Sequence, residues 1–473
     1  MLVVASRIEL IAPVGRRLAV QGIEYGPQHV TFSYVLDDRY RFVTRILYHD
    51  LDLESLTRQS PVGLLRRLFA HAALFEGFKF MACFPAVYDV TAIADGLDAG
   101  SLDAASEWPA HLWTQHLYEN QVADWWGPEV ITRAPLGCVE TVAAAGDPEQ
   151  GPLLCANGGG KDSFLVLKTL EAAGVPIAAF HQARSEYGRF DVQHRLHERP
   201  LRHVPSLLRS HRLTVHDDFT DGEFLSVYAP RMRGDVVRGY PCQVGSPEMI
   251  FNALPLVLAH GYAGIVLGNE RSADAPQASW EPLGRPVNHQ WLKSRKAEEL
   301  FDQFVREHLF AGLPVFSLLR PVCDHRIYAR SAAWPEVLPD VHSCNVEKPW
   351  CRRCAKCAYV WIQLVATLGR NRVDAVFDKN LLDDPALMID WRRLLGLEDR
   401  NSFECVGTVG ETRLAFRTAH AAGVRGAAME VFRSEVLDDP HVPWDDYLAE
   451  ADSIHEDDHR IPPSLWERVR PLL

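Results

Sequence analysis

A glycine-rich segment carries the residues with the clearest chemistry in this sequence. It reads Asn157-Gly-Gly-Gly-Lys-Asp-Ser163 and lies between a short apolar run, Leu153–Ala156, and an amphipathic run, Phe164–Leu170. This order predicts a strand, a tight turn and the start of a helix. Glycines allow positive φ and a close approach of the backbone, so N–H groups at the helix N-terminus can face an anion. With Lys161 as a cation and two polar side chains after it, the segment predicts a phosphate-binding loop.

The spacing of this loop does not fit two common nucleotide motifs. A Walker loop needs G-x-x-x-x-G-K-[ST], and a dinucleotide fingerprint needs a third glycine further on and a later acidic residue. Gly158–Ser163 instead resembles the S-G-G-x-D-S loop of the PP-loop ATP pyrophosphatases, with Gly158 where that superfamily usually has serine. The resemblance implies cleavage of ATP between its α and β phosphates and adenylation of a substrate. A flexible surface turn is the alternative, and the apolar run before the loop and the helix after it disfavour that alternative.

Four of the ten cysteines form a C-x6-C-x2-C-x2-C cluster, made of Cys344, Cys351, Cys354 and Cys357. In an intracellular protein this spacing indicates a metal site rather than a disulfide framework. Four thiolates suit a structural, tetrahedral zinc, and an iron–sulfur cluster is the alternative. We expect the remaining cysteines, including Cys83, Cys138 and Cys405, to be ordinary core residues.

The elements around the loop alternate between strands and helices. Val175–Phe180 and Gly264–Leu267 are predicted strands, with helical segments between them. Such alternation predicts an α/β fold with a parallel sheet and helices on both faces. In these sheets a ligand binds beyond the carboxyl ends of the strands. The glycine-rich loop, His181 and Gly268–Asp274 all follow predicted strands, so we expect them to share one crevice.

The sequence divides into three predicted parts. Residues 1–150 predict an α+β domain, because Val30–Val35 and Tyr40–Leu47 indicate a β-hairpin and apolar residues at helical spacing follow. Residues 151–370 predict the catalytic domain, with a PP-loop (adenine nucleotide alpha hydrolase-like) fold and the cysteine cluster. Residues 371–473 predict a mostly helical region.

Composition bears on partners and location. The chain has 473 residues and a formal net charge of −13. This acidity disfavours a nucleic-acid partner, and the basic stretches Arg195–Arg212 and Arg231–Arg238 suit solvated faces or contacts to a small anion. Met1–Arg7 lacks the pattern of a signal peptide, and no apolar run is long enough to cross a bilayer. We therefore expect a cytoplasmic enzyme with a small anionic substrate and no membrane partner. The sequence does not tell whether the chain is a monomer or an oligomer. The acidic stretch Glu456–Asp458 is expected to be solvated surface.

Several segments together resemble the MurL-type UDP-N-acetylmuramoyl-L-alanyl-L-glutamate epimerases. Besides the glycine-rich loop, these segments are Gly268–Asp274, Asn288–Ser294, Phe316–Pro321, Ser343–Cys357 and Phe403–Thr408. The resemblance covers most of the chain and is weakest in the first 150 and the last 50 residues. The cysteine cluster is also similar to the zinc site of the PP-loop enzymes that make 7-cyano-7-deazaguanine.

The resemblance implies ATP-dependent inversion of the terminal L-glutamate of a nucleotide-linked muramyl dipeptide, for peptidoglycan synthesis. A free carboxylate is already anionic, so removal of the neighbouring α-proton would place a second charge on the same group. Adenylation removes the first charge and makes the carbonyl an electron sink. A base can then take the α-proton, an acid can return a proton to the other face, and water can release AMP.

Roles for individual residues follow from the resemblance. The ATP site would contain Asn157, Gly158, Gly159, Gly160, Lys161, Asp162, Ser163, His181, Gly268 and Asn269. Asp162 is the expected magnesium-linked carboxylate, because magnesium prefers oxygen ligands and neutralises phosphates. Glu270 and Asp274 could hold a second magnesium ion or orient the substrate, or they could cap a turn.

Candidate residues for the substrate and for proton transfer complete the site. Lys293, Arg320 and Arg326 suit a carboxylate or pyrophosphate, although each alone is more often an ion-pair residue. His289, Asp324 and His325 are candidates for acid–base catalysis, with Cys323 as a thiol alternative. A single histidine is also commonly structural.

Three alternative functions remain open at this point. An acyl-adenylate attacked by ammonia or sulfur would give an amide, nitrile or thioamide. An epimerase of another peptide C-terminus, for instance in a natural-product pathway, would keep every motif. A non-catalytic nucleotide sensor or scaffold would bind ATP without releasing pyrophosphate.

Overall fold

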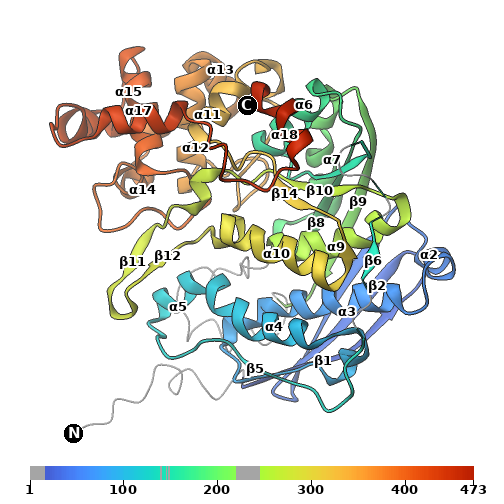
Figure 1. The fold of residues 1–473 in the computed structure, drawn as a ribbon. Helices are drawn as coiled ribbons and strands as arrows, with labels where there is room; N and C mark the ends of the chain where they lie inside the picture. Colours follow the sequence, from blue (N-terminus) through green and yellow to red (C-terminus); the bar gives the residue numbers. More distant parts are fainter. Residues whose placement is uncertain (1–15, 139–140, 145, 147–149, 220–244) are drawn as a thin grey trace, which may run out of the picture.

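A computed structural model describes residues 16–138, 141–144, 146, 150–219 and 245–473. The expectations for Met1–Arg7 and for Arg231–Arg238 lie outside the described residues. Within the described part, one central sheet contains ten strands (Figure 1). In spatial order they are β14 (Val315–Ser317), β10 (Gly264–Leu267), β7 (Leu153–Ala156), β8 (Ile177–Arg184), β9 (Leu207–Asp217), β3 (Tyr40–Tyr48), β2 (His29–Leu36), β1 (Arg17–Tyr25), β4 (Val87–Asp89) and β5 (Glu129–Ile131).

The half of the sheet from β14 to β9 is parallel throughout. Its connections include α6 (Lys161–Ala172), α7 (Phe190–Glu198), α9 (Gly245–His260) and α10 (Arg295–His308). This arrangement confirms the expected α/β fold with a parallel sheet. Since parallel strands end at the same edge, the segments after β7 and β10 lie beside each other, as the sequence predicted.

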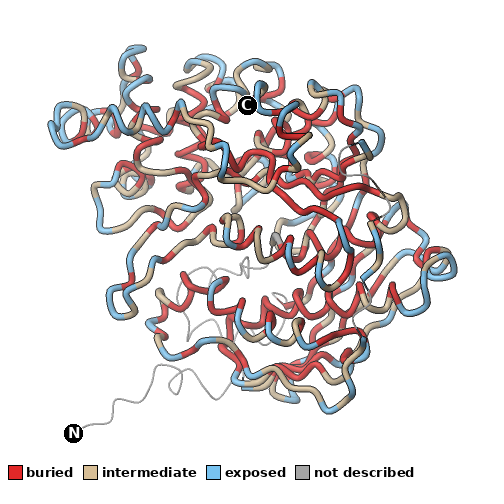
Figure 2. The backbone as a smooth tube through the Cα atoms, in the orientation of Figure 1, coloured by how far each residue is buried: buried red, intermediate tan, exposed pale blue. Residues whose placement is uncertain are grey.

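Alternate residues of the parallel strands enter two separate hydrophobic cores. On β7, Leu154 packs into a core shared with α9 and α10, whereas Leu153 and Cys155 pack into a core shared with α6 and the C-terminal helices. On β10, Ile265 and Val266 divide in the same way. A strand buried on both faces is continuously apolar, and Figure 2 shows buried residues throughout this central region. The expected helices on both faces are therefore present.

The N-terminal strands extend this same sheet. The predicted hairpin is confirmed, because β2 and β3 pair antiparallel in register from His29↔Leu47 to Leu36↔Tyr40. The other edge of β3 pairs antiparallel with β9. Lys79 reinforces that junction: its buried ammonium pairs with Glu76 at 3.1 Å and with Asp217 at the end of β9. A domain boundary near residue 150 stays a prediction, although the sheet itself runs across that position.

The N-terminal part contains further helices, two of which pack against its strands β1 and β5. These helices are α2 (Leu53–Gln59), α3 (Leu64–Glu76), α4 (Ala99–Leu112) and α5 (Thr114–Asn120), with 3₁₀ turns that include η1 (Gly77–Cys83) and η2 (Thr91–Gly96). Two short strand pairs lie outside the main sheet. They are β11 (Ala278–Trp280) with β12 (Arg285–Val287), and β6 (Val142–Ala143) with β13 (Phe310–Ala311).

The C-terminal part is helical, as expected. Its elements are α11 (Asp324–Ser331), α12 (Ala355–Leu368), α13 (Arg370–Phe377), α14 (Met388–Leu394), α15 (Val409–Ala421), α16 (Ala427–Phe432), α17 (Trp444–Asp452) and α18 (Pro463–Val469). Figure 1 shows most of these helices at the end of the molecule opposite β1 and β5. Asp458 is only partly solvated: it forms ion pairs with Arg271 and Arg295 and so ties the C-terminal segment to the region after β10. Among the described helices, none has the length and apolar character needed to span a membrane.

Candidate active site

The glycine-rich loop is folded by the side chain of Asn157, directly after β7. The Asn157 Oδ1 accepts hydrogen bonds from the N–H of Gly159 at 2.9 Å and from the Ser163 hydroxyl at 3.2 Å. Its Nδ2 donates to the carbonyl of His197 at 2.8 Å. Asn157 and Ser163 therefore shape the turn from within, and α6 begins at Lys161 as the sequence predicted. The N-cap residue Gly160 offers no side-chain acceptor to the first turn of α6, which suits an anion at this place.

The three glycines of the loop meet different surroundings. Gly159 has φ +72°, and a Cβ there would lie 2.2 Å from Cε1 of His342. The His342 N–H also donates to the Gly159 carbonyl at 2.9 Å. A Cβ on Gly158, in contrast, would meet no atom within 4 Å. Local packing therefore requires glycine at position 159, a Cβ on Gly160 would lie 3.3 Å from the carbonyl oxygen of His342, and Gly158 borders open space.

Lys161 is buried and is paired with two carboxylates rather than pointing to solvent. Its Nζ is 2.5 Å from Oδ1 of Asp162 and 2.5 Å from Oδ1 of Asp324, and it lies 4.4 Å from the centre of the Tyr328 ring. Burial opposes the charge, but the two carboxylates hold the pKa of Lys161 well above its ordinary value. Lys161 is therefore a fixed cation at the base of the loop, and Asp324 lies beside the residues of the expected ATP site.

Glu270 and Lys293 form the next part of the same charged cluster. Burial raises the pKa of the Glu270 carboxyl, with Lys293 opposing the rise and Asp162 adding to it. Although burial opposes it, Cys405 and then Glu270 raise the pKa of Lys293. The cluster thus runs from Lys161 through Glu270 to Lys293 and contains both signs of charge. It can bind an anion and also offer groups that exchange protons.

Arg320 holds two of these residues in place. Its buried guanidinium donates to the carbonyl of Glu270 at 2.8 Å and to the carbonyl of Lys293, and it contacts Asp274 at 3.2 Å. Asp274 in turn accepts from the N–H of Arg295 at 2.7 Å. Arg320 and Asp274 therefore position Glu270 and Lys293, and the substrate-binding role expected for both stays a prediction. The alternative role for Asp274 was to cap a turn. Its hydrogen bond from the backbone N–H of Arg295, the first residue of α10, resembles such a cap.

Gly268 brings the end of β10 against the beginning of α6. A Cβ on Gly268 would lie 3.4 Å from the backbone carbon of Asp162, and Asn269, which follows it, is almost fully buried. The predicted neighbours of the loop at this strand end are therefore close to it in the structure.

His181 belongs to a row of buried histidines. Its Nε2 lies 3.1 Å from Nδ1 of His194, its ring centre is 5.2 Å from that of His197, and His197 stacks on His342 beside the loop. Burial lowers the pKa of each of these four imidazoles. His181 is thus linked to the loop through two further rings.

The other predicted acid–base residues have different surroundings. His325 contacts Gln363, with 2.9 Å between Nδ1 and Oε1, and its N–H donates to Glu411 at 2.9 Å. Cys323 packs against Leu414, and burial raises the pKa of its thiol, which disfavours a thiolate. Arg326 donates to two backbone carbonyls near the C-terminus, those of Leu473 at 3.0 Å and Asp452 at 2.9 Å. The catalytic roles expected for His325 and Cys323 and the substrate-binding role expected for Arg326 stay predictions.

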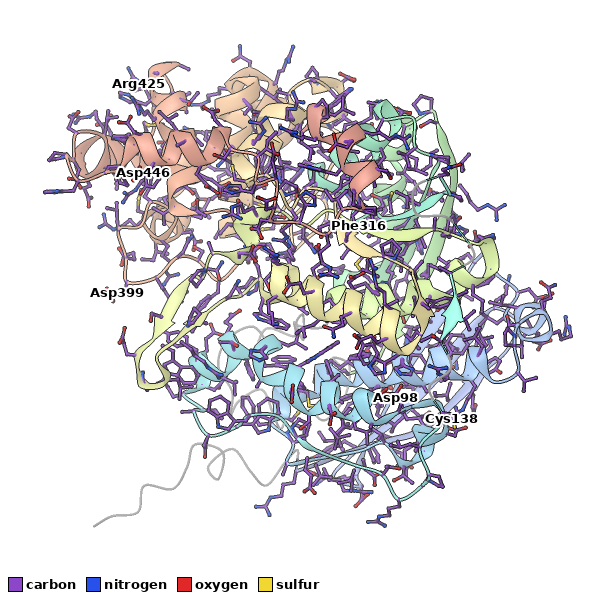
Figure 3. The ribbon with its side chains drawn as sticks, viewed as in Figure 1. Asp98, Cys138, Phe316, Asp399, Arg425 and Asp446 are labelled. Atoms are coloured by element: carbon purple, nitrogen blue, oxygen red, sulfur yellow. The ribbon has the colours of Figure 1, made fainter. Side chains whose placement is uncertain are left out.

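Cys405 was expected to be a core residue, and the structure places it in the charged cluster instead. It is half-buried and interacts with Lys293, His289 and Lys356. Cys138, for which the same was expected, is exposed in the N-terminal part (Figure 3), far from Phe316 of β14. The sequence did contain a hint that Cys405 belongs to the site, because Phe403–Thr408 is one of the segments that resemble the epimerases.

The four-cysteine cluster has the geometry of a metal site. Its four Sγ atoms lie within 4.8 Å of one another, at the N-terminus of α12. The N–H groups of Val346, Glu347 and Cys351 are each 3.4 Å from Sγ of Cys344. Such donors stabilise thiolates, so this donor set could hold a metal ion. The ammonium of Lys356, between two of the cysteines, donates to the carbonyl of Cys405, so the cluster also positions the charged site.

Comparison with known proteins places this chain in a family. The family models for the MurL N-terminal domain and the MurL C-terminal domain match residues 250–318 and 340–445. A UDP-N-acetyl-alpha-D-muramoyl-L-alanyl-L-glutamate epimerase from Xanthomonas oryzae pv. oryzae is 32% identical over 349 residues, which cover 70% of this chain and 71% of the relative. The chain belongs to the MurL family.

Two further relatives are named as the same epimerase. The epimerase from Salinispora tropica is 37% identical over 182 residues, and the one from a Micromonospora species is 30% identical over 305 residues. These alignments cover 36% and 61% of this chain, and 39% and 61% of the two relatives. No solved structure matches the chain. The expected membership of the MurL family is therefore confirmed.

Proposed function

We propose that this chain is an ATP-dependent epimerase that converts UDP-MurNAc-L-Ala-L-Glu to UDP-MurNAc-L-Ala-D-Glu through an acyl-adenylate. The alignment over 70% of the chain with a relative named for this epimerase activity carries the proposal. The geometry supports it, since a loop suited to phosphate lies beside a buried cluster of lysines and carboxyls. The product is a precursor for peptidoglycan, so a cytoplasmic location is part of the proposal.

The residues of the site match the needs of each step. The loop from Asn157 to Ser163 would hold the ATP phosphates, with Lys161 fixed at its base by Asp324. Lys293 is a half-buried cation suited to hold the glutamyl carboxyl group, because Arg320 fixes its backbone. A fixed cation near a developing enolate lowers the barrier to proton removal. This set of residues would therefore serve both activation of the carboxyl group and labilisation of its neighbouring C–H bond.

Two metals belong to the proposal. Magnesium would be bound through Asp162 and would neutralise the phosphates and the leaving pyrophosphate. Zinc would be held by Cys344, Cys351, Cys354 and Cys357 as a closed structural site. The N–H groups directed at Cys344 Sγ support thiolates, and the position of the cluster at the start of α12 supports a structural role.

Incubation in heavy water with ATP, magnesium and the muramyl dipeptide nucleotide tests the proposal. We expect deuterium at the glutamate α-carbon, D-glutamate in the product, and AMP with pyrophosphate. Label without ATP consumption, or ATP consumption without label, would reject the coupling. Lys161→Gln should abolish both signals, because it removes the cation at the base of the loop. Lys168→Gln is the matched control, since this lysine of the same helix pairs with Glu171 away from the loop.

A further inference from the structure

Three segments that are distant in the sequence hold the Cys405 loop in the charged site. The carbonyl of Val406 accepts from Nε2 of Gln290 at 2.8 Å. The carbonyl of Cys405 accepts from the ammonium of Lys356 on α12. The ring of Phe403 packs edge-on against Tyr118 of α5, with 5.8 Å between centres. Cys405 is therefore fixed in place by its backbone, which leaves its side chain for other contacts.

The thiol of Cys405 lies among cations. Its side chain is hydrogen-bonded to His289, and its charged neighbours are Lys293 at the end of η10 (Trp291–Lys293), Lys356 on α12 and Lys348 beside the cysteine cluster. Burial opposes the thiolate, but Lys293, His289 and Lys356 together hold the pKa of Cys405 well below its ordinary value. Burial raises the pKa of Cys155, and burial together with the carboxylates of Glu411 and Asp324 raises that of Cys323. Among these three cysteines, Cys405 is the one whose surroundings favour the anion.

His289 is itself held in one orientation. Its Nδ1 lies 2.5 Å from Oε1 of Gln115, and its backbone N–H donates to Oε1 of Gln277 at 2.8 Å. An amide oxygen at Nδ1 favours a proton on that nitrogen. The hydrogen bond to Cys405 is then left to the other ring nitrogen of a histidine whose ring is held by Gln115 and whose backbone is held by Gln277. The order Gln–His–Cys is the arrangement in which a third group orients a base beside a thiol.

We propose that Cys405 is a catalytic residue that removes the α-proton of the activated glutamyl group, with His289 as the residue that positions and supports its thiolate. This inference rests on the proposed function. It reassigns the thiol role from Cys323 to Cys405, and it gives His289 a supporting role beside the base.

The proton transfer balances with groups already described. The C–H bond breaks, an S–H bond forms on Cys405, and the electron pair moves to the carbonyl oxygen of the activated carboxyl group. The pair returns to the α-carbon when a proton is added to the opposite face, and this inverts the centre. Glu270 supplies that proton: it is the buried carboxyl group that shares Lys293 with Cys405. Exchange with solvent then restores both groups for the next turnover.

Two reactions of the full chain separate the role of Cys405 from the role of the loop. In Cys405→Ala we expect exchange of labelled pyrophosphate into ATP to persist, because the loop and Lys293, which would serve adenylation, are both left in place. Epimerisation and deuterium incorporation should fall by about 10²–10⁴-fold, the usual contribution of a positioned base. Cys138→Ser, which changes an exposed thiol, should leave both reactions unchanged. Wild-type epimerisation by Cys405→Ala, or equal loss of both reactions in a folded variant, would overturn the assignment.

Alkylation by iodoacetamide gives a second readout that needs no substrate. Since the thiolate is the reacting form, Cys405 should stay reactive at pH values where the reaction of Cys138 has already slowed. His289→Asn should shift the pH profile of Cys405 upward, an effect that a merely structural histidine would not produce. A Cys405 profile that coincides with that of Cys138 would refute the inference. If the wild-type chain fails to epimerise, the proposed function fails, while the alkylation profile still reports on Cys405.

Discussion

Lys161 and Asp324 form an ion pair with 2.5 Å between Nζ and Oδ1, although 163 positions separate them in the sequence. Both side chains are less than a tenth exposed. The pair joins the start of α6, at the glycine-rich loop, to the start of α11. A group at the loop therefore depends on a residue that the chain supplies much later, and the site cannot form before the C-terminal helices have docked.

Asp324→Asn tests this dependence. Removal of one partner leaves a buried charge with less compensation, which typically costs 3–5 kcal/mol; we expect about 3 kcal/mol, because Asp162 still contacts Lys161. Chemical denaturation measures the loss, and pyrophosphate release should fall with it. Asp340→Asn is the control, since its pair with His203 is about a quarter exposed and should contribute below about 1 kcal/mol. Equal effects of both substitutions would contradict the argument.

Gly159→Ala and Gly158→Ala form a matched pair within the loop. Alanine at φ +72° costs about 1–2 kcal/mol in the backbone, and its Cβ would also meet the His342 ring. We expect Gly159→Ala to lose stability and ATP binding, measured by denaturation and calorimetry. Gly158→Ala should keep both, because a Cβ there meets no atom within 4 Å. A tolerated Gly159→Ala would show that the loop can adopt another shape.

Removal of the metal should loosen the start of α12. In Cys351→Ser we expect loss of bound zinc by elemental analysis and a lower unfolding midpoint, because a metal ligand is gone. Epimerisation should fall as well, since Lys356 no longer holds the backbone of Cys405 firmly. Cys138→Ser should change neither the metal content nor the midpoint. If the purified chain contained iron and labile sulfide, the site would hold an iron–sulfur cluster and not zinc.

Acidification should destabilise the fold below about pH 6.5. Burial lowers the pKa of His71 and of His116 to about 4, and that of His342 to about 3. The unfolded chain therefore binds more protons between these values and 6.5, so stability is present above pH 6.5 and is lost as pH falls towards the folded pKa. Each histidine should contribute about 2 kcal/mol of this loss at pH 5.

Denaturation at pH 7 and pH 5 measures this slope. His116→Gln should reduce the difference between the two values, because one buried imidazole no longer has to stay neutral. His441→Gln, at an exposed position, should leave the difference unchanged. A free energy of unfolding that is equal at both pH values would contradict the prediction.

Local signals predicted the parallel half of the sheet and the loop. The apolar run before Asn157 and the glycines after it specify a strand and a turn without reference to distant residues, and β10 has the predicted bounds. The four cysteines also needed only their spacing. In each case, the physical cause lies within a few residues of the feature.

Features built from distant segments escaped the sequence. In the sequence, Cys405 cannot be told from an ordinary core cysteine. Only the folded chain places Lys293, His289 and Lys356, from two other segments, around it. The sequence also did not reveal that the guanidinium of Arg320 donates to the backbone carbonyls of Glu270 and Lys293. Asp458 looked solvated, whereas Arg271 and Arg295 meet it across the fold. Residue types fix what a side chain can do, while tertiary pairing decides what it does.

The pairing of β3 with β9 has a consequence for synthesis on the ribosome. Thr44 and Asp217, which face each other across this junction, are 173 positions apart. The nascent meander β1–β2–β3 therefore emerges with an unpaired edge, and Lys79 emerges without one of its two counter-ions. An open strand edge invites pairing with other chains. Until β9 has left the exit tunnel, the edge of β3 stays open to such pairing.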